Sequence, residues 1–183
     1  MNREFWNGKT VLITGHTGFK GSWLTLWLKK VGVKVIGFSK DIPTKPSLFE
    51  LADISNNINS IEGDIRNYDE IQNTIAKTKP EIIFHLAAQS LVRSSYTNPR
   101  ETYETNIMGT VNLLDAVRSL EKTCVIINVT SDKCYDNKEF NKSHIEEDRL
   151  GGYDPYSSSK GCSELITSAF RNSYFEATNH EIT

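Results

Sequence analysis

Val11-Leu-Ile-Thr-Gly15-His-Thr-Gly18-Phe-Lys-Gly21 is the stretch that decides the fold of this 183-residue chain. An apolar run that ends at Thr14 predicts a fully buried strand, and a loop with glycine at every third position follows it. Gly15 permits a tight turn, Gly18 lets the backbone approach a phosphate, and Gly21 lets the next helix pack closely. The stretch therefore predicts a dinucleotide-binding strand–loop–helix unit, with the diphosphate at the helix N-terminus.

Apolar strands and helices alternate along the rest of the chain. Further strands are predicted at residues 33–38, 58–61, 81–86 and 125–129, and helices at residues 19–31, 67–79, 99–117 and 156–170. The apolar stripe expected on the helix over 99–117 consists of Ile107, Val111, Leu114 and Val117. Because the strands are apolar throughout, the pattern predicts an α/β fold, a Rossmann-like parallel sheet with helices on both faces. Ligands of such sheets bind at the carboxyl ends of the strands.

Composition excludes several classes of partner. The chain has 21 Lys and Arg against 23 Asp and Glu, a net charge of −2, which excludes a generally basic nucleic-acid binder. No apolar run approaches ~18 residues, and the N-terminus has no apolar signal stretch, so we expect no membrane association. Cys124, Cys134 and Cys162 show no CxxC spacing, so we expect reduced thiols in a cytoplasmic protein and no metal site.

Other cofactor contacts are expected where the strands end. Ser39, followed by Lys40 and Asp41, occupies the position where an acidic residue often binds the adenosine ribose. Lys40 favours a 2′-phosphate and Asp41 favours a free 2′-hydroxyl, so this position alone leaves NAD and NADP open. Asp64 is placed to accept a hydrogen bond from the adenine amino group. The expected cofactor-binding residues are Gly15, His16, Thr17, Gly18, Phe19, Lys20, Gly21, Ser39, Asp64, Ile65, Leu86, Ala87, Ala88, Gln89, Asn106, Tyr156 and Lys160.

Tyr156-Ser-Ser-Ser-Lys160 places a phenol and an ammonium four residues apart, on one face of the last predicted helix. A nearby cation favours the phenolate form of a tyrosine. Such a tyrosine can take the proton of a sugar hydroxyl while a hydride leaves the same carbon. The alternative for this motif is the exposed start of a helix. Its occurrence downstream of a glycine loop, in a parallel-sheet protein, favours the catalytic interpretation.

Ser131-Asp132-Lys133 follows the strand predicted at 125–129, so a hydroxyl, a carboxylate and an amine emerge together at a strand's carboxyl end. Ser131 is suited to bind a substrate hydroxyl, Asp132 to act as a general acid and Lys133 as a base, provided that their surroundings favour those protonation states. The alternative is a charged turn with solvated side chains. The expected catalytic residues are Ser131, Asp132, Lys133, Tyr156 and Lys160, and the expected substrate contacts are Gln89, Ser90, Arg93 and Ser131.

Several longer strings resemble the extended short-chain dehydrogenase/reductases and, within them, the CDP-glucose 4,6-dehydratase family. The strings are Gly15-His-Thr-Gly-Phe-Lys-Gly-Ser22, Pro46-Ser-Leu-Phe-Glu-Leu51, His85-Leu-Ala-Ala-Gln89, Thr130-Ser-Asp-Lys-Cys-Tyr135 and Gly151-Gly-Tyr-Asp-Pro-Tyr-Ser-Ser-Ser-Lys-Gly161, together with Asn106. The resemblance runs from the first residues to about Asn172. Strings of this length are far more specific than a glycine triplet.

The resemblance implies NAD as the cofactor and CDP-glucose as the nucleotide-sugar substrate. Tyr156 would deprotonate the sugar 4-hydroxyl during a transient oxidation at carbon 4, and Asp132 would protonate the leaving 6-hydroxyl. The product would be CDP-4-keto-6-deoxyglucose, released with water. Relatives that act on dTDP-glucose usually carry Asp-Glu, with glutamate as the base, so Lys133 fits the CDP-glucose branch. The resemblance also implies a homodimer that pairs through the two long helices.

Family members are much longer than this chain, so we expect the half that binds the cofactor without most of the C-terminal substrate domain. In this interpretation residues 1–177 form the NAD-binding Rossmann domain and residues 178–183 form a tail. Two alternatives stand beside the dehydratase. One is a truncated module that binds NAD without turnover, and the other is a different nucleotide-sugar dehydratase or epimerase of the same fold.

Overall fold

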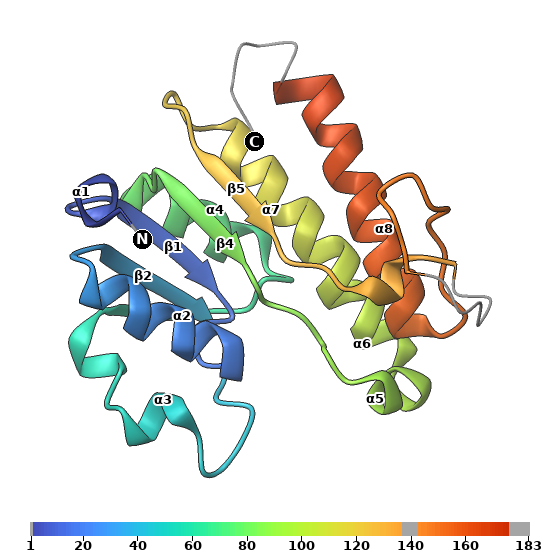
Figure 1. Cartoon of the computed structure of the whole chain (residues 1–183), viewed down its shortest axis with the longest axis horizontal. Helices are drawn as coiled ribbons and strands as arrows, with labels where there is room; N and C mark the ends of the chain where they lie inside the picture. Colours follow the sequence, from blue (N-terminus) through green and yellow to red (C-terminus); the bar gives the residue numbers. More distant parts are fainter. Residues whose placement is uncertain (1, 137–142, 176–183) are drawn as a thin grey trace.

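Five parallel strands form one sheet in the order β3-β2-β1-β4-β5 (Figure 1). In this computed structural model, residues 2–136 and 143–175 are described, and the predicted tail at 178–183 lies outside them. The strands are β1 (Thr10–Thr14), β2 (Lys34–Ser39), β3 (Asn59–Glu62), β4 (Ile82–His85) and β5 (Val125–Asn128). All five predicted strands are present, with ends that differ from the prediction by at most one residue. The predicted Rossmann-like fold is thereby confirmed.

Helices cover both faces of this sheet. The longer ones are α2 (Phe19–Lys30), α4 (Tyr68–Thr78), α7 (Gly109–Arg118) and α8 (Pro155–Phe170), and the shorter ones are α1 (Arg3–Trp6), α3 (Leu48–Leu51), α5 (Val92–Thr97) and α6 (Pro99–Tyr103). Two 3-10 turns, Ser55–Asn57 and Asp132–Cys134, and two π-helical segments, Glu104–Met108 and Arg171–Phe175, complete the described structure. The sequence pattern missed α1, α3 and α5, because each is too short to show a helical period.

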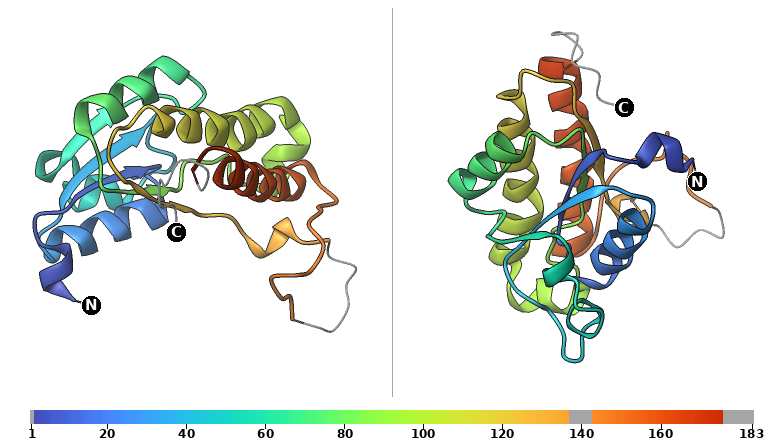
Figure 2. Two further views of the ribbon diagram at one scale, coloured as in Figure 1. Left: turned by 90° about the horizontal axis from the view of Figure 1, so that it is seen from above. Right: turned by 90° about the vertical axis from the view of Figure 1, so that its left-hand side faces the viewer.

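Two hydrophobic cores lie on opposite faces of the sheet. Figure 2 shows α2 on one face and α4 with α7 on the other. Leu28 of α2 is fully buried against Val11 and Ile13 of β1. Ile71 of α4 and Leu113 of α7 are fully buried on the opposite face. β1, β2 and β4 are therefore covered from both sides, which explains why they are largely apolar rather than alternating. The edge strand β3 is mostly exposed and carries polar residues.

Helix α4 begins with a side-chain cap at Asn67. The side-chain carbonyl of Asn67 accepts from the backbone N–H groups of Asp69 and Glu70, at 3.1 and 3.4 Å. The Asn67 amide in turn donates to the Glu70 carboxylate at 2.8 Å. Lys79 ends the helix in the left-handed conformation, and Pro80 follows it. Local capping therefore fixes both ends of this element.

The long helix that begins at Pro99 is not uniform. A π-helical segment, Glu104–Met108, connects α6 to α7, and one extra residue per turn rotates the helix face that follows. Ile107 and Val111 of the predicted apolar stripe are consequently only half-buried, whereas Asn106 and Leu113 are buried. The predicted stripe was right for the second half of this helix and wrong for the first half.

Helix α2 departs from its apolar spacing in another way. Phe19, Trp23 and Trp27 are exposed, although they recur at helical intervals. The side of α2 that contacts the sheet carries the small residues Gly21 and Ser22. Small residues there allow the helix backbone to approach the strands closely, which turns the large aromatic side chains outward. Within residues 2–136 and 143–175, no helix combines the length and the apolar character that a bilayer span requires.

Candidate functional site

The loop between β1 and α2 has the tight geometry that its glycines predict. Gly15 has a φ of +75°, and a Cβ atom there would come within 2.8 Å of the backbone nitrogen of Ala87. A Cβ atom on Gly21 would lie 2.1 Å from the carbonyl oxygen of Gly15. No side chain larger than hydrogen fits at either position. The predicted roles of both glycines, in the turn and in close helix packing, are confirmed.

Gly18 differs from its two neighbours because the space in front of it is open. Its Cβ position would meet only the Gly15 carbonyl oxygen, at an ordinary contact distance of 3.4 Å. Gly18 is the N-cap residue of α2, and no side chain of the described chain caps this helix. The first N–H groups of a helix lack partners within the helix and carry partial positive charge. The N-terminus of α2 therefore offers donors to an anionic ligand such as a diphosphate.

A cleft of about 570 Å³ runs along the carboxyl ends of the strands. That volume is typical of a site for a small molecule or cofactor. The predicted residues that line it are Gly15, Thr17, Gly18, Phe19, Lys20, Gly21, Ser39, Asp64, Ile65, Leu86, Ala87, Ala88, Gln89, Ser90, Tyr156 and Lys160. The predicted residues that do not line it are His16, Arg93, Asn106, Ser131, Asp132 and Lys133. The structure therefore brings most of the predicted cofactor residues together, and only part of the predicted chemistry.

The side chain of His16 is buried beneath the glycine loop rather than in the cleft. Its ring nitrogens form hydrogen bonds of 2.8 Å with the hydroxyls of Ser39 and Ser60. The ring packs on Gly37, where a Cβ atom would come within 2.2 Å of it. Burial lowers the pKa of His16 to about 4, so the imidazole is neutral at pH 7. His16 therefore joins the loop to β2 and β3, and any contact with the cofactor would come from its backbone.

The ribose position at the end of β2 holds Ser39, Lys40 and Asp41, and all three line the cleft. The Ser39 hydroxyl is bound by His16 and accepts from the backbone N–H of Thr17 at 3.4 Å. Thr17 also donates its hydroxyl hydrogen to the Asp41 carbonyl at 2.6 Å. The glycine loop and the end of β2 are therefore joined directly, which fixes the wall of the cleft on this side.

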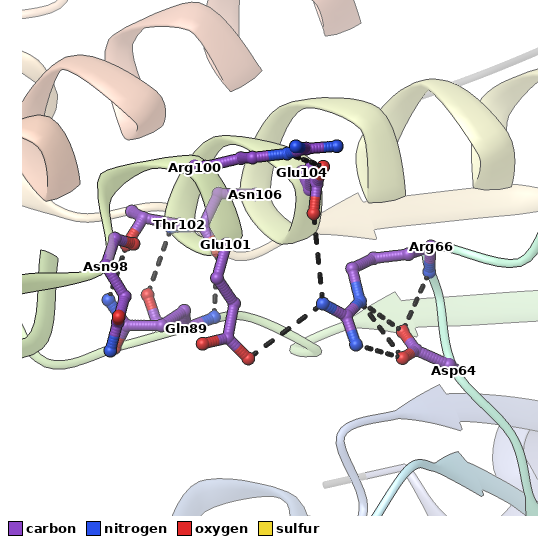
Figure 3. Close-up of polar contacts among 9 residues, drawn as sticks. All are labelled: Asp64, Arg66, Gln89, Asn98, Arg100, Glu101, Thr102, Glu104 and Asn106. Carbon is purple, nitrogen blue, oxygen red and sulfur yellow. Dashed lines mark hydrogen bonds and ion pairs between the residues drawn. The ribbon is translucent and has the colours of Figure 1, made fainter.

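Asp64 lies opposite, after β3, where an adenine ring was expected. The guanidinium of Arg66 donates to both Asp64 carboxylate oxygens at 2.6 to 3.0 Å (Figure 3). Arg66 holds the pKa of the Asp64 carboxyl below its usual range, mainly through this hydrogen bonding. Asp64 is therefore an ionised acceptor at neutral pH. Arg66 also lines the cleft, and the sequence analysis missed it.

Tyr156 and Lys160 are buried together at the start of α8, and both line the cleft. Asp154 caps this helix by accepting from the backbone N–H of Ser157 at 3.0 Å, and Pro155 occupies the first helical position. The Lys160 ammonium donates to the Val129 carbonyl at 3.3 Å. Burial first, and then the positive charge of Lys20, lowers the pKa of Lys160 to about 8.

Asn106 lies in the π-helical segment Glu104–Met108, which forms a bulge in the backbone of the long helix. Its side chain accepts from the Gln89 N–H at 2.8 Å and donates to the Gln89 carbonyl at 3.0 Å (Figure 3). It also donates to the Ser159 hydroxyl at 2.8 Å. The bulge therefore joins the loop after β4 to the helix turn that carries Lys160. Asn106 acts on the cleft through these neighbours rather than by lining it.

The Gln89 side chain is occupied by contacts within the chain. Its amide nitrogen donates to the Thr102 hydroxyl at 2.9 Å (Figure 3). The same nitrogen donates to the Leu91 carbonyl at 3.1 Å. Its amide oxygen accepts from the Leu91 N–H at 2.7 Å. The Gln89 side chain therefore stabilises the loop that carries it. Its contact with a sugar stays a prediction. Ser90 lines the cleft, whereas Arg93 of α5 lies outside it.

Asp132 and Lys133 lie in the 3-10 turn Asp132–Cys134 after β5, and Ser131 is the N-cap residue of this turn. All three residues lie outside the cleft. The Ser131 hydroxyl donates to the Asp132 carboxylate at 3.0 Å and accepts from the Lys133 N–H at 3.2 Å. Asp132 and Lys133 are exposed. The described residues do not provide the burial that an acid and a base would need here. Their roles stay predictions.

Several residues that line the cleft were not predicted from the sequence. They are Phe38, Lys40, Asp41, Pro43, Thr44, Gly63, Arg66, Leu91, Glu101, Thr105, Val129 and Thr130. Lys40 and Asp41 were discussed as ribose neighbours, and Arg66 follows Asp64 by two residues, so proximity in sequence could have indicated these three. Glu101 lies on α6 and Thr105 on the π-helical segment that follows it. Only the fold brings these two residues to the cleft. No cluster of metal-ligating side chains occurs in the described part of the chain.

The sheet order, the glycine loop after β1 and the Tyr156/Lys160 pair at the carboxyl edge define a Rossmann protein of the short-chain dehydrogenase/reductase class. The chain belongs to the GDP-mannose 4,6 dehydratase family, whose model matches residues 12–182. CDP-glucose 4,6-dehydratase of Salmonella typhimurium is 54% identical over 181 residues, which are 99% of this chain and 50% of that protein. CDP-paratose 2-epimerase of Salmonella typhi is 34% identical over 171 residues, which are 84% of this chain and 50% of that protein.

Solved structures agree with this family. A UDP-glucose 4-epimerase from Brucella ovis, solved in complex with NAD, matches with a TM-score of 0.77 at 25% identity. The match covers 91% of this chain and 49% of the epimerase chain. An epimerase from Methanothermobacter thermautotrophicus has a TM-score of 0.81 at 26% identity, covering 98% and 51%. The chain spans about half the length of the relatives it matches. The predicted resemblance to CDP-glucose 4,6-dehydratases is confirmed as homology.

Proposed function

We propose that this chain is the cofactor-binding half of an NAD-dependent CDP-glucose 4,6-dehydratase, which converts CDP-glucose to CDP-4-keto-6-deoxyglucose and water. One observation carries the proposal. The chain is 54% identical to a CDP-glucose 4,6-dehydratase over almost its whole length, and the Tyr156/Lys160 pair of that resemblance lies in the same cleft as the glycine loop. The three free cysteines of the described chain fit the expected cytoplasmic location.

The residues of the cleft fit a dinucleotide. The open space before Gly18 and the N-terminus of α2 suit the diphosphate. The adenosine half would lie between the Ser39–Asp41 segment and Asp64, and Lys160 would hold the nicotinamide half near Tyr156. Bound NAD, held by these residues, would supply the hydride chemistry of a transient oxidation at carbon 4 of the sugar. Lys40 and Asp41 both line the cleft at the ribose position, and NAD rather than NADP is proposed from the homology to the dehydratase.

Tyr156 would take the proton of the sugar 4-hydroxyl through its phenol oxygen. Lys160 is charged below a pKa of about 8, and its ammonium lies one helical turn from the phenol, so it stabilises the phenolate electrostatically. The 4-ketone that forms acidifies the proton on carbon 5. In the proposed reaction Lys133 removes that proton and Asp132 protonates the departing 6-hydroxyl, while Ser131 binds the sugar.

The exposed turn at Ser131–Lys133 must be covered for this second stage. The relatives have as much chain again as this one, and we propose that the remainder of the protein covers the turn and completes the sugar site. The two long helical units, α6–α7 and α8, expose Met108 and Leu165, which supports the predicted homodimer through these helices. The alternative of a module that binds NAD without turnover is supported by the coverage of the dehydratase relative, of which the chain spans 50%.

A second enzyme activity has one specific observation in its favour. The 34% identity to a CDP-paratose 2-epimerase covers 84% of this chain, and such an epimerisation would use the same cleft. The Asp132–Lys133 pair argues for the dehydratase, because an epimerase has no hydroxyl to expel.

Incubation of the chain with NAD and CDP-glucose, followed by mass spectrometry of the nucleotide sugar, tests the proposal. Loss of one water from the sugar is the result expected of a dehydratase, whereas a product of unchanged mass but altered stereochemistry would indicate an epimerase. Tyr156→Phe should abolish turnover. Tyr153→Phe is the matched control, since Tyr153 is fully exposed three residues upstream, and it should leave turnover unchanged. Binding of NAD without any product would favour the truncated module.

A further inference from the structure

Arg66 holds the Asp64 carboxylate in one orientation. Its side-chain Nε donates to both carboxylate oxygens at 3.0 Å, and Nη2 donates to Oδ2 at 2.6 Å. The backbone N–H of Arg66 donates to Oδ1 at 3.0 Å as well. Three N–H groups of one residue therefore converge on one carboxylate (Figure 3). A fork of this kind fixes both the position and the plane of its acceptor.

Arg66 is itself fixed from the helix on the other side of the cleft. Its Nη1 lies 3.9 Å from the Glu101 carboxylate and 4.0 Å from that of Glu104 (Figure 3). The side-chain amide of Asn112 donates to the carbonyls of Ile65 and Arg66, at 3.0 Å each. The loop after β3 is therefore attached to the α6–α7 helix through both the side chain and the backbone of Arg66.

The chemistry that Asp64 can perform follows from these contacts. An ionised carboxylate offers about four acceptor positions and no donor. Arg66 makes four contacts with the carboxylate through three N–H groups, because its Nε–H is shared between both oxygens. Three hydrogens leave about one acceptor position for a ligand. Asp64, Arg66 and Glu101 all line the cleft. The remaining position can take a hydrogen bond only from a donor on the ligand.

We infer that Arg66 is a positioning residue that makes the adenine end of the cleft selective for a 6-amino purine over a 6-oxo purine. The inference rests on the proposed function, because it assumes that a dinucleotide binds here. The amino group of adenine donates to the fixed Asp64 oxygen. The 6-oxo group of hypoxanthine would set a second acceptor against that carboxylate, leaving two oxygens without a hydrogen between them.

Calorimetric titration with NAD and with nicotinamide hypoxanthine dinucleotide tests the inference without any need for turnover. The unmodified chain should bind NAD about tenfold more tightly, the worth of one good hydrogen bond. Arg66→Lys keeps the positive charge but loses the fork, and it should reduce the preference to less than about threefold through weaker NAD binding alone. Arg100→Lys is the matched control. Arg100 pairs with Glu104 at 2.6 Å but is largely exposed, so the preference should persist.

Four outcomes would overturn the inference. They are equal binding of the two dinucleotides by the unmodified chain, an unchanged preference in Arg66→Lys, an equal loss of affinity for both ligands in that variant, and a loss of preference in the control. Failure of the unmodified chain to bind NAD would overturn the proposed function and this inference with it. If circular dichroism shows that Arg66→Lys is unfolded, the double variant Glu101→Gln/Glu104→Gln decides. This double variant removes the two negative charges that pair with Arg66 Nη1. It should at least halve the preference for NAD over the hypoxanthine dinucleotide, and an unchanged preference would overturn the inference.

Discussion

The ammonium nitrogen of Lys160 donates a hydrogen bond to the backbone carbonyl oxygen of Val129, 3.3 Å away. This contact joins α8 to the carboxyl end of β5 and holds a buried cation in the cleft beside Tyr156. Burial and the charge of Lys20 lower the pKa of Lys160 to about 8. The amine therefore changes charge about one pH unit above neutral.

Lys160→Met should change how stability depends on pH. The pKa of Lys160 is about 8 in the folded chain and near 10.5 in the unfolded chain, so the unfolded state binds more protons between these values. The stability of the unmodified chain should therefore rise with pH in this window, by at most about 3 kcal/mol relative to the methionine variant. Urea unfolding of both proteins at pH 7, 8, 9 and 10 measures the difference. Parallel curves across this range would contradict the assignment.

Glu164→Gln should lower the pKa of Lys160 further. Glu164 opposes the effect of Lys20, because its negative charge raises the pKa of Lys160, and its carboxylate accepts the hydroxyl hydrogen of Thr130. Glutamine keeps an acceptor for Thr130 and removes only the charge. NMR titration of a carbon-13 methylated lysine reports the change, and a pKa that stays at about 8 would show that Glu164 does not act on the amine.

Two alanine substitutions in the glycine loop should separate packing from ligand binding. Gly21→Ala would set a Cβ atom 2.1 Å from the Gly15 carbonyl and should destabilise the chain by about 2 kcal/mol or more. Gly18→Ala meets nothing closer than 3.4 Å. It should change stability by less than about 0.5 kcal/mol and weaken NAD binding by about tenfold. Thermal unfolding and NAD titration of both variants check this, and similar behaviour of the two would refute the distinction.

His16→Gln should reduce the loss of stability in mild acid. Burial lowers the pKa of His16 from 6.5 to about 4, so the unfolded chain binds a proton that the folded chain does not. The stability that this provides is complete above pH 6.5 and falls as the pH approaches 4, by at most about 3 kcal/mol. Glutamine cannot titrate, and unfolding measured at pH 7 and 4.5 should show a smaller loss.

Local sequence predicted the elements well and their long-range contacts poorly. The apolar run before Gly15 and the cap at Asn67 act over a few residues, so the first strand and the start of α4 were predictable. The orientation of His16 was not, because the space it fills is made by Gly37 and Ser60 on two other strands. The sequence placed His16 among the phosphate-binding residues, whereas in the structure its buried side chain connects the glycine loop to β2 and β3.

The candidate site divides in the same way. Tyr156 and Lys160 lie one helical turn apart, so a helix alone was enough to predict that they act together. Arg66 follows β3, whereas its partner Glu101 lies on α6, after β4. Only the fold brings these two residues together, and no local pattern indicates the contact. Asp132 is exposed in the described structure. Spacing along the chain indicates where this carboxylate lies but not whether its surroundings suit a general acid.

A crystal structure of the chain grown with NAD would show directly whether the cleft binds this cofactor. We predict the diphosphate on the backbone of Gly18, the adenine amino group on Asp64, and the nicotinamide beside Tyr156 and Lys160. A dinucleotide bound elsewhere, or an empty cleft at a saturating concentration of NAD, would contradict it.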